Sequence, residues 1–427
     1  MYKQLTLLFT FSSFCFSQEV YTLDDCIRIA LESNRNLRVA QLQVSLAEAD
    51  RKGSLAVILP RIGASTGSFQ QGSYTNLQFG IPVPESEYHS GSISLNQNIF
   101  DGGNWWNQIA LSKNIYQLSV ENELATKIST VLAVKRAYYQ LLKNIELLEV
   151  ARQQVELSEQ QVERVRQQYE VEAVAKTDLL KQQVLLGEVQ VQLLNQEAIL
   201  ENSTRVLANT MGINVNSKFD LSQTGQKRST LESQNELWEI VAERNQAIVS
   251  RRMQITASEI RVKIARAGYF PSISASLGYS GSSDKIDQLY SDVDKHWRQS
   301  LSLSISYPLF TGLQQSSQLQ RAKIDAEIAR EEFDRLTRDL RVQFDSYYRQ
   351  WENISRSIPI YTETKASAEE DLRLVQEMYN LGASTILDVL NAQLSLARAN
   401  SSLVRASYDE RIPVSYTHLT LPTILLV

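Results

Sequence analysis

The fold is decided by residues 131–170, VLAVKRAYYQLLKNIELLEVARQQVELSEQQVERVRQQYE. They belong to a longer run, Trp105 to Met211, that contains no proline and a single glycine, Gly187. This composition is typical of long helices. Apolar residues recur at spacings of three and four, which predicts a helix that buries one narrow stripe and exposes the rest to water. A helix of this length cannot bury its stripe alone and therefore needs helical neighbours.

The periodicity falters between Glu170 and Lys176, which predicts the tip of a helical hairpin. Thr177 and Asp178 are expected to start the returning helix, because both residue types are favoured at helix N-termini. The first arm, Trp105 to Glu170, would span roughly 100 Å at about 1.5 Å per residue. Pro359, in the corresponding arm of the second half, predicts a kink or a junction between helices.

The N-terminal residues Met1 to Ser17 have the layout of a cleaved secretory signal, with Lys3 ahead of an apolar run. After it, Thr22 and Asp25 predict a capping box that starts one amphipathic helix through Leu55, which Pro60 ends. Without the signal, Cys26 is the remaining cysteine and cannot form an internal disulfide.

Four stretches alternate between apolar and small polar residues with period two, which predicts strands. They lie near 61–79, 90–100, 272–282 and 299–310. No stretch after the signal is apolar for the 18 to 20 or so residues that a spanning helix requires, so entry into a membrane would have to use these strands. Four strands cannot close a membrane barrel, which needs about eight, and an open edge is not tolerated in lipid. Copies of the chain must therefore combine, two giving eight strands or three giving twelve.

The two halves of the chain repeat the same order of features. Phe270-Pro271 corresponds to Leu59-Pro60, Thr311-Gly312 to Asp101-Gly102, and Tyr379 to Gln393 to Tyr169 to Gln183. The separation stays near 210 residues, for example 379 − 169 = 210. So constant an offset indicates an internal duplication.

This duplication predicts the domain organisation. We expect a signal peptide at 1–17, a first repeat at 18–212, a polar connector at 213–236, a second repeat at 237–410 and an atypical tail at 411–427. Each repeat would hold a helix, two strands (within 61–100 and within 272–310) and a long helical hairpin (105–211 and 313–410). The tail shows neither helical period nor charge, which indicates non-native sequence in place of the true terminus; a genuine short apolar C-terminus is the alternative.

Charge and composition exclude several classes of function. The net charge is −5 and no basic block is present, which argues against nucleic-acid binding. His89 and His296 fall in predicted outer loops and His418 in the tail, without the spacing of a metal site or a nucleophile motif. The sequence therefore predicts neither an enzyme nor a bound cofactor.

Several motifs of the chain resemble those of TolC-type outer-membrane efflux proteins. They are Leu23 to Leu31, the strand-to-helix junctions Ile99 to Gly103 and Leu309 to Gly312, and above all Tyr379 to Gln393. The resemblance runs from about Tyr21 to Asp409. It implies a mainly helical fold with a transmembrane β-barrel, in which a homotrimer combines four strands per protomer into a twelve-stranded barrel and long antiparallel hairpins form an α-barrel.

The resemblance also implies a function. The protein would be the outer-membrane exit duct of a tripartite efflux pump or type I secretion system in a Gram-negative bacterium, embedded in outer-membrane lipid. Its partners would be a periplasmic adaptor and an inner-membrane transporter. A coiled-coil structural or adaptor protein, periplasmic or secreted and without a membrane barrel, is the alternative. The serine-alternating strands favour the duct, because a soluble adaptor has no need of paired strands between long helices.

By motif position, the resemblance implies that the hairpin tips form a closed gate. The candidate residues are Asp388 and Asn391 for a selectivity ring, and Asp178, Tyr379, Gly382 and Ser384 for the tip lock and turn. Asn391 stands where the best-known member has a second acid, and Ser384 where it has the lock's arginine, so we expect a weaker charge-based latch. As alternatives, Asp388 would cap a helix, Asp178 and Tyr379 would pack the turn, and Gly382 would supply a positive φ.

Overall fold

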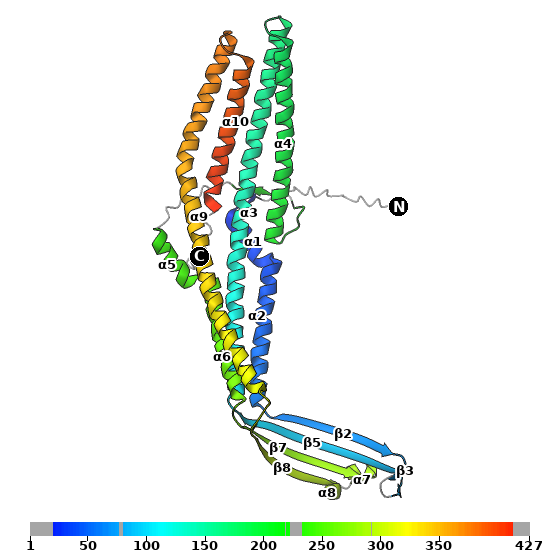
Figure 1. The fold of residues 1–427 in the computed structure, drawn as a ribbon. Helices are drawn as coiled ribbons and strands as arrows, with labels where there is room; N and C mark the ends of the chain where they lie inside the picture. Colours follow the sequence, from blue (N-terminus) through cyan, green and yellow to red (C-terminus); the bar gives the residue numbers. More distant parts are fainter. Residues whose placement is uncertain (1–19, 77–79, 218, 223–232, 292, 413–427) are drawn as a thin grey trace, which may run out of the picture. The chain divides into compact units, whose positions relative to one another are not determined.

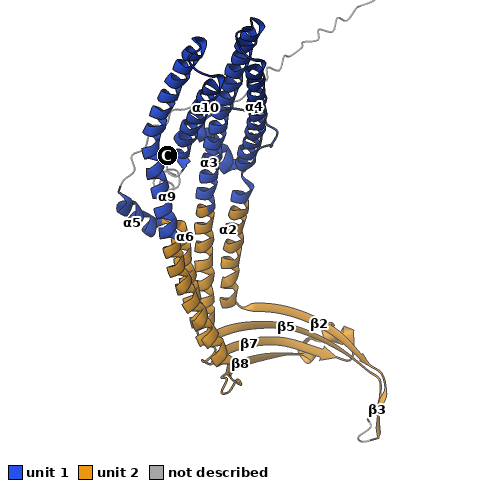
Figure 2. Cartoon of the chain, turned by 45° about the horizontal axis from the view of Figure 1, so that its top comes forward, with its two compact units in different colours: residues 1–38, 126–244, 340–427 blue, residues 39–125, 245–339 orange. Residues whose placement is uncertain are grey.

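The computed structural model describes residues 20–76, 80–217, 219–222, 233–291 and 293–412. The predicted signal peptide, residues 1–17, and most of the predicted tail, residues 413–427, lie outside this range. The chain divides into two compact units, coloured separately in Figure 2. Unit 1 comprises residues 1–38, 126–244 and 340–427, and unit 2 comprises residues 39–125 and 245–339. Each unit draws on both sequence repeats.

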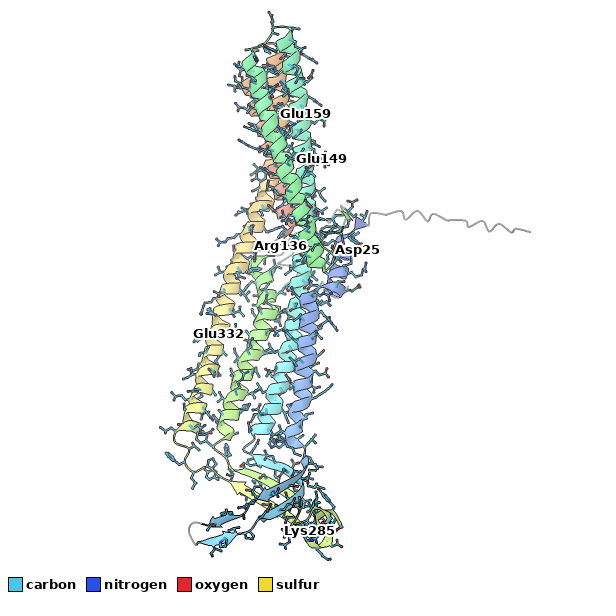
Figure 3. All side chains as sticks on the ribbon, turned by 90° about the vertical axis from the view of Figure 1, so that its right-hand side faces the viewer. Asp25, Arg136, Glu149, Glu159, Lys285 and Glu332 are labelled. Carbon is cyan, nitrogen blue, oxygen red and sulfur yellow. The ribbon has the colours of Figure 1, made fainter. Side chains whose placement is uncertain are left out.

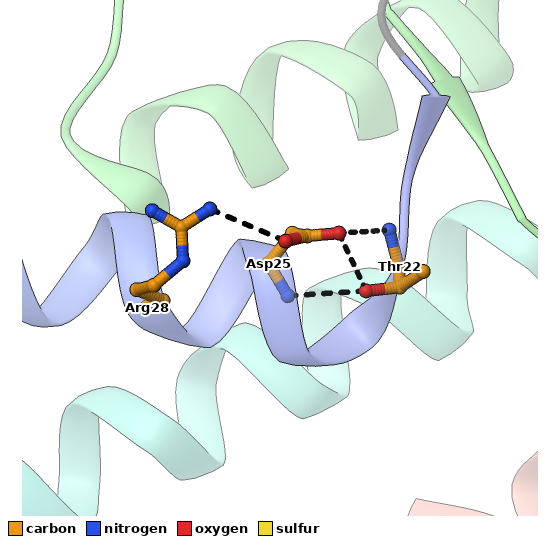
Figure 4. A network of polar contacts seen from close by, with 3 residues as sticks. All are labelled: Thr22, Asp25 and Arg28. Carbon is orange, nitrogen blue, oxygen red and sulfur yellow. Dashed lines mark hydrogen bonds and ion pairs between the residues drawn. The ribbon is translucent and has the colours of Figure 1, made fainter.

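The first helix begins where the sequence predicts but ends earlier. Thr22 and Asp25 form the expected capping box at the start of α1 (Leu23–Ser33), with Arg28 pairing to the same carboxylate (Figure 4). The prediction of a single helix through Leu55 is wrong, because α2 (Arg35–Ser54) is a separate helix. Asn34 separates the two: its backbone is extended, and its side-chain oxygen accepts hydrogen bonds from the backbone N–H groups of residues 36 and 37. Such side-chain caps compete with helix continuation.

Unit 1 is built from two helical hairpins. The first joins α3 (Asn104–Glu170) to α4 (Lys176–Met211), and the second joins α9 (Gln314–Asn380) to α10 (Ile386–Asp409); both are labelled in Figure 1. The sequence predicts a kink or a junction between helices at Pro359. The junction is wrong, because α9 is one helix through that residue. Neighbouring helices can support a helix across the single hydrogen bond that proline removes.

The core of unit 1 gathers α1, α3, α4 and α10. Tyr138 and Tyr139 are almost fully buried there. Gly212 ends α4 at a φ of +79° and packs against the backbone of Ser33, so a side chain at this position would collide with α1. Near the other end of this core, the Lys143 ammonium and Asp409 carboxylate pair at 2.8 Å. Two short segments, β1 (Val20–Tyr21) and β6 (Asp220–Leu221), pair in parallel beside it. Helix α5 (Gln234–Arg244) also belongs to this unit.

Unit 2 contains a four-stranded antiparallel sheet. Its order is β2 (Arg61–Gln71), β5 (Ser86–Asp101), β7 (Ser272–Ser283) and β8 (Trp297–Ser306), so each repeat supplies one hairpin (Figure 1). The expected extension of the last strand to residue 310 is wrong; β8 ends two residues before Pro308, which has no N–H to donate to a ladder. The first strand likewise ends at Gln71 rather than near 79, and a short pair, β3 (Tyr74–Asn76) with β4 (Ile81–Val83), follows it.

The two faces of this sheet differ in chemistry. On one face Leu95 lies beside Leu277, which lies beside Leu301, and the leucine of the last strand is 79% exposed. The opposite face is rich in serine, chiefly on β5, β7 and β8, and the Ser65 and Ser92 hydroxyls lie 2.7 Å apart. Within the described residues, β2 and β8 each have one edge without a strand partner. The sheet therefore exposes an apolar face and two open edges in the single chain.

The expectation that His89 lies in an outer loop is wrong. His89 sits within β5, buried, with its Nδ1 2.7 Å from the Ser68 hydroxyl of β2. Two short helices, α7 (Ile286–Ser291) and α8 (Val293–His296), connect β7 to β8. The Trp297 indole donates to the Leu289 backbone oxygen at 2.8 Å, which holds α7 against the end of the sheet.

The helices of unit 2 are α2, α6 (Gln246–Ala267) and the adjoining parts of α3 and α9. Arg251 pairs with Glu332 at 2.7 Å, which ties α6 to α9. At the strand-to-helix junction, Gly102 takes a φ of +71° where a Cβ would collide with the backbone of Ala267. In the part of the chain that the structure describes, none of the helices is long and apolar enough to cross a membrane.

Candidate functional site at the two helical tips

The second tip, between α9 and α10, is a well-defined helix end followed by a capped helix start. The backbone N–H of Ala383 donates to Met378 O at 2.8 Å and that of Gly382 to Tyr379 O at 3.0 Å, the bonding pattern of a Schellman motif. Gly382 takes a φ of +71°, which confirms the predicted use of glycine at this turn. The Ser384 hydroxyl donates to Val375 O at 3.2 Å, nine residues earlier in α9, so its contact is within its own hairpin.

Asp388 caps the helix that follows. Its carboxylate accepts from the Thr385 backbone N–H at 2.8 Å and from the Thr385 hydroxyl at 2.7 Å, which completes a capping box. These hydrogen bonds, the side-chain bond first, hold the pKa of the Asp388 carboxyl below its usual range. Asp388 therefore caps a helix in the single chain, which was the alternative to its role in a selectivity ring. The same hydrogen bonds favour its ionised form. Asp388 and Asn391 are both exposed.

The first tip, between α3 and α4, has the same backbone but different side chains. Ala173 N–H donates to Gln168 O at 2.8 Å and Glu172 N–H to Tyr169 O at 2.9 Å, the same pair of bonds as at the second tip. Glu172 takes a φ of +60° at the position that Gly382 occupies in the second repeat. This left-handed conformation costs a non-glycine residue about 1–2 kcal/mol.

The predicted start of the returning helix at Thr177 and Asp178 is wrong by one to two residues. Helix α4 begins at Lys176 after Ala175, which has no side-chain oxygen to cap it. Asp178 therefore lies in the first turn, where a carboxylate is favourable to the helix dipole. Its Oδ1 lies 3.4 Å from the Lys181 ammonium. The first tip thus has the acid of a capping box without the hydroxyl.

The two tips pack against each other inside the protomer through an apolar cluster, here called the tip cluster. Its fully buried members are Val165, Ile386 and Val389, and its partly buried members are Val174, Leu179, Val375 and Tyr379. All four long helices or their turns contribute. The single protomer therefore holds its two tips together by apolar contact.

Tyr379 lies in this cluster, with its hydroxyl buried and without a hydrogen-bond partner among the described residues. Burial, and secondly the negative charge of Asp178, raise the pKa of Tyr379. The structure thus brings Asp178 and Tyr379 together without a hydrogen bond between them. Ser384 makes its contact with α9 of its own hairpin, while Asp388 and Asn391 stand on the exposed side of α10. Whether any of these six residues gates a passage stays a prediction.

Sequence reasoning missed two features near the tips. Arg373 on α9 bridges Glu370 at 2.6 Å and Glu377 at 2.7 Å, which holds charge on the outer surface of the hairpin. The second feature is a set of buried glutamines within the hairpins. Gln154, Gln161 and Gln168 recur every seven residues, and this heptad spacing was the available signal that they share one face of α3.

The sequence profile of the family described as outer membrane efflux protein matches residues 26–213 and 237–412. The two matched segments cover most of the chain, one in each repeat. The chain belongs to the outer membrane efflux protein family. This assignment confirms the resemblance to TolC-type proteins and places the chain in the outer membrane of a Gram-negative bacterium.

Curated relatives and solved structures agree with the family. The chain is 24% identical to the outer membrane protein TolC of Vibrio cholerae, over 83% of this chain and 80% of the relative. It is 22% identical to the outer membrane efflux protein BepC of Brucella suis, over 91% of this chain and 82% of that protein. The fold is similar to a crystal structure of CusC, with a TM-score of 0.84 at 19% identity and coverage of 93% and 91% of the two chains.

A second structural neighbour, the outer-membrane channel OprN, has a TM-score of 0.83 at 17% identity, covering 93% of this chain and 89% of that one. At such low identity these neighbours speak for the fold alone. They confirm the predicted fold class: long helical hairpins with a four-stranded sheet per chain, arranged as an internal duplication.

Proposed function

We propose that three copies of the chain form an exit duct of an efflux pump or type I secretion system, which passes substrates from the periplasm through the outer membrane. The observation that carries the assembly is the sheet of unit 2. It has an apolar face, which is favourable in lipid, and two open edges, which are unfavourable in lipid unless further strands pair with them. Three copies would supply twelve strands, above the minimum of about eight for a membrane barrel.

The side chains on the two faces of the sheet indicate what each face would contact in this assembly. The face with Leu95, Leu277 and Leu301 would contact lipid, and the serine face would line a polar lumen. This division supports the duct over a coiled-coil structural or adaptor protein, which would leave the apolar face in water.

The assembly is tested by native mass measurement of the purified protein in lipid nanodiscs, together with conductance in planar bilayers. A trimer that conducts ions is expected. A stable monomer, or a trimer without conductance, would contradict the proposal.

The helical tips are the proposed gate. Asp388 of three protomers would form a ring at the narrow end of the duct, and the capping box supports this role because it keeps the carboxylate ionised. Asp178, Tyr379, Gly382, Ser384 and Asn391 complete the tip. A ring of three like charges attracts cations more strongly than one solvated carboxylate does.

Two variants separate the charge of Asp388 from its capping role. Asp388→Asn removes the charge and keeps a short side chain that can accept from backbone N–H groups. Thr385→Ala breaks the capping box and keeps the charge. We expect lower cation selectivity in reversal-potential measurements on Asp388→Asn and unchanged selectivity on Thr385→Ala. Equal reversal potentials for the wild type and Asp388→Asn would contradict the proposal that Asp388 forms a selectivity ring.

A periplasmic adaptor and an inner-membrane transporter are the proposed partners. Apolar side chains at both turns support a docking role, with Val171 74% and Leu381 84% exposed at equivalent positions of the two tips. Site-specific crosslinking in cells, from each of these positions, tests the proposal. Crosslinks to a periplasmic protein are expected, and crosslinks between copies of the chain alone would count against an adaptor.

A further inference from the structure

A layer of polar side chains lies inside the packed hairpins of unit 1. Ser158 is 0% exposed, Gln161 2%, Gln182 0% and Gln393 2%. They come from α3, α4 and α10. We call these four residues the polar layer. Burying a hydroxyl or amide without a hydrogen bond costs free energy, so continuous apolar packing would be more favourable here.

Two apolar clusters adjoin the layer. One is the tip cluster defined above. The other, here called the shaft cluster, has Val155, Leu185 and Val189 as its buried members, with Leu186, Leu193, Leu390 and Leu394 packed against them. Each of the three helices contributes to both clusters.

Helix positions place the three polar residues of α3 and α4 between these clusters. On α3, Ser158 and Gln161 lie between Val155 of the shaft cluster and Val165 of the tip cluster. Residues three apart on a helix share a face, so both side chains point to the same side. The neighbouring Glu159 is exposed on the outside of the helix (Figure 3).

Helix α4 shows the same order, because Gln182 lies between Leu179 of the tip cluster and Leu185 of the shaft cluster. On α10, Gln393 lies one turn beyond Val389 of the tip cluster, between Leu390 and Leu394 of the shaft cluster. The adjoining Ala392 packs in an apolar cluster with Leu372 of α9. Apolar packing is therefore interrupted at this level on α3 and α4, and it continues on α10.

Five polar atoms of the layer have no hydrogen-bond partner among the described residues. They are Ser158 Oγ, Gln161 Oε1, Gln182 Oε1, Gln182 Nε2 and Gln393 Oε1. The set contains acceptors and a donor, and none of its side chains is charged. A metal cation would satisfy the oxygens and leave the amide N–H₂ group unpaired. A ligand that both donates and accepts, without charge, satisfies the whole set, and water has these properties.

We propose that the polar layer binds internal water and that this hydrated layer is the plane at which the tips move relative to the rest of the hairpins. Water-mediated hydrogen bonds can exchange partners without exposing apolar surface. Each cluster has three buried members, so the tip cluster can open separately from the shaft cluster. The inference rests on the packing of one protomer and not on the trimeric duct.

The unmodified protein gives the first test. A structure at a resolution that shows ordered solvent is expected to place water within hydrogen-bond distance of at least two of the four side chains. A layer without water, in which the glutamines bond to one another, would overturn the proposal. This measurement requires no variant and is independent of transport.

A variant gives the second test. The change Ser158→Ala, Gln161→Leu, Gln182→Leu and Gln393→Leu together replaces the layer by apolar residues of similar or smaller volume. Gln183→Leu is the matched control, because this glutamine adjoins the layer in sequence and is exposed. Amides of the tips, residues 162–181 and 379–392, are expected to exchange hydrogen about tenfold more slowly in the fourfold variant and unchanged in the control. Unchanged or faster exchange in the fourfold variant would overturn the hinge.

Discussion

The first tip lacks one hydroxyl of a capping box, and Ala175→Thr supplies it. Ala175 precedes α4 with φ −76° and ψ 149°, close to the φ −98° and ψ 161° of Thr385 at the second tip. Asp178 already stands three residues further on, as Asp388 does after Thr385. The backbone and the acid are therefore in place, and threonine is compatible with this conformation.

The magnitude follows from two competing contacts. A threonine in place of alanine at a helix N-cap stabilises by about 1 kcal/mol. Engaging Asp178 in the box weakens its pair with Lys181, in which the lysine side chain is 45% exposed, and such exposed pairs contribute about 0.3 kcal/mol. The net gain is about 0.7 kcal/mol per protomer, which corresponds to roughly threefold in the equilibrium of local opening.

Hydrogen exchange of the first turn of α4 is the suitable assay, because it reports the local opening of this turn. A melting temperature is less suitable, because a protein of this size does not unfold in one step. Amides of residues 177–180 are expected to exchange roughly threefold more slowly in Ala175→Thr. The double variant with Asp178→Ala is the control, and it should lose most of the gain. An equal gain with and without the Asp178 carboxylate would refute the capping-box reasoning.

Four further outcomes are expected. Tyr379→Phe leaves protomer stability unchanged or raises it by about 1 kcal/mol in denaturant unfolding, because the buried hydroxyl has no partner in the described chain; a loss above about 1 kcal/mol would show that a partner exists. Gly102→Ala destabilises unit 2 by about 3 kcal/mol or prevents membrane assembly, since its φ is +71° and a Cβ would meet backbone; normal assembly would contradict this. Burial raises the pKa of Cys26 to about 12, so a thiol reagent at pH 8 should label Cys26 only after unfolding, and labelling of the native protein should begin only as pH approaches that value. Lys143→Ala leaves the Asp409 carboxylate without its partner and should lower stability by about 1–2 kcal/mol, less than for a fully buried pair because the carboxylate is 40% exposed; Lys143→Arg should recover part of the loss.

Local sequence signals predicted the parts of the fold that depend on backbone chemistry. Thr22 with Asp25 marked a helix start, Gly212 marked a helix end, and Gly382 marked a turn with positive φ. Each works because few residue types satisfy the requirement. The alternation of serine with apolar residues predicted the strands for a similar reason, since period two exposes one chemistry on each face.

The errors arose where tertiary contacts outweigh local propensity. Nothing adjacent to Asn34 predicts a break in the helix, but its side-chain amide also donates to Thr210 O at 2.9 Å, 176 residues away. Pro359 is tolerated within a helix whose neighbours support it. Glu172 adopts a glycine-like conformation because the Schellman bonds of the first tip require it.

The candidate site was predictable only in its position. Equivalent residues of the two repeats located both tips, and the structure brings Asp178 near Tyr379 as the resemblance implied. The polar layer was not found, because glutamine on a helix is ordinarily read as a solvated residue. On α3, Gln161 of the layer recurs at heptad spacing with Gln154 and Gln168, and this spacing distinguishes a buried position from an exposed one only when the neighbouring helices are known.

The interleaving of the two units has a consequence for biogenesis. Unit 1 requires residues 340–427 to join segments that begin at the N-terminus, and unit 2 requires residues 245–339 to join residues 39–125. A nascent chain that has emerged only as far as its midpoint therefore lacks Val404 and Tyr408, the α10 residues that complete the core of unit 1. Such a chain must be kept from aggregating until synthesis and export are nearly complete, and a truncation in the last eighty residues removes support from the earliest-made helix.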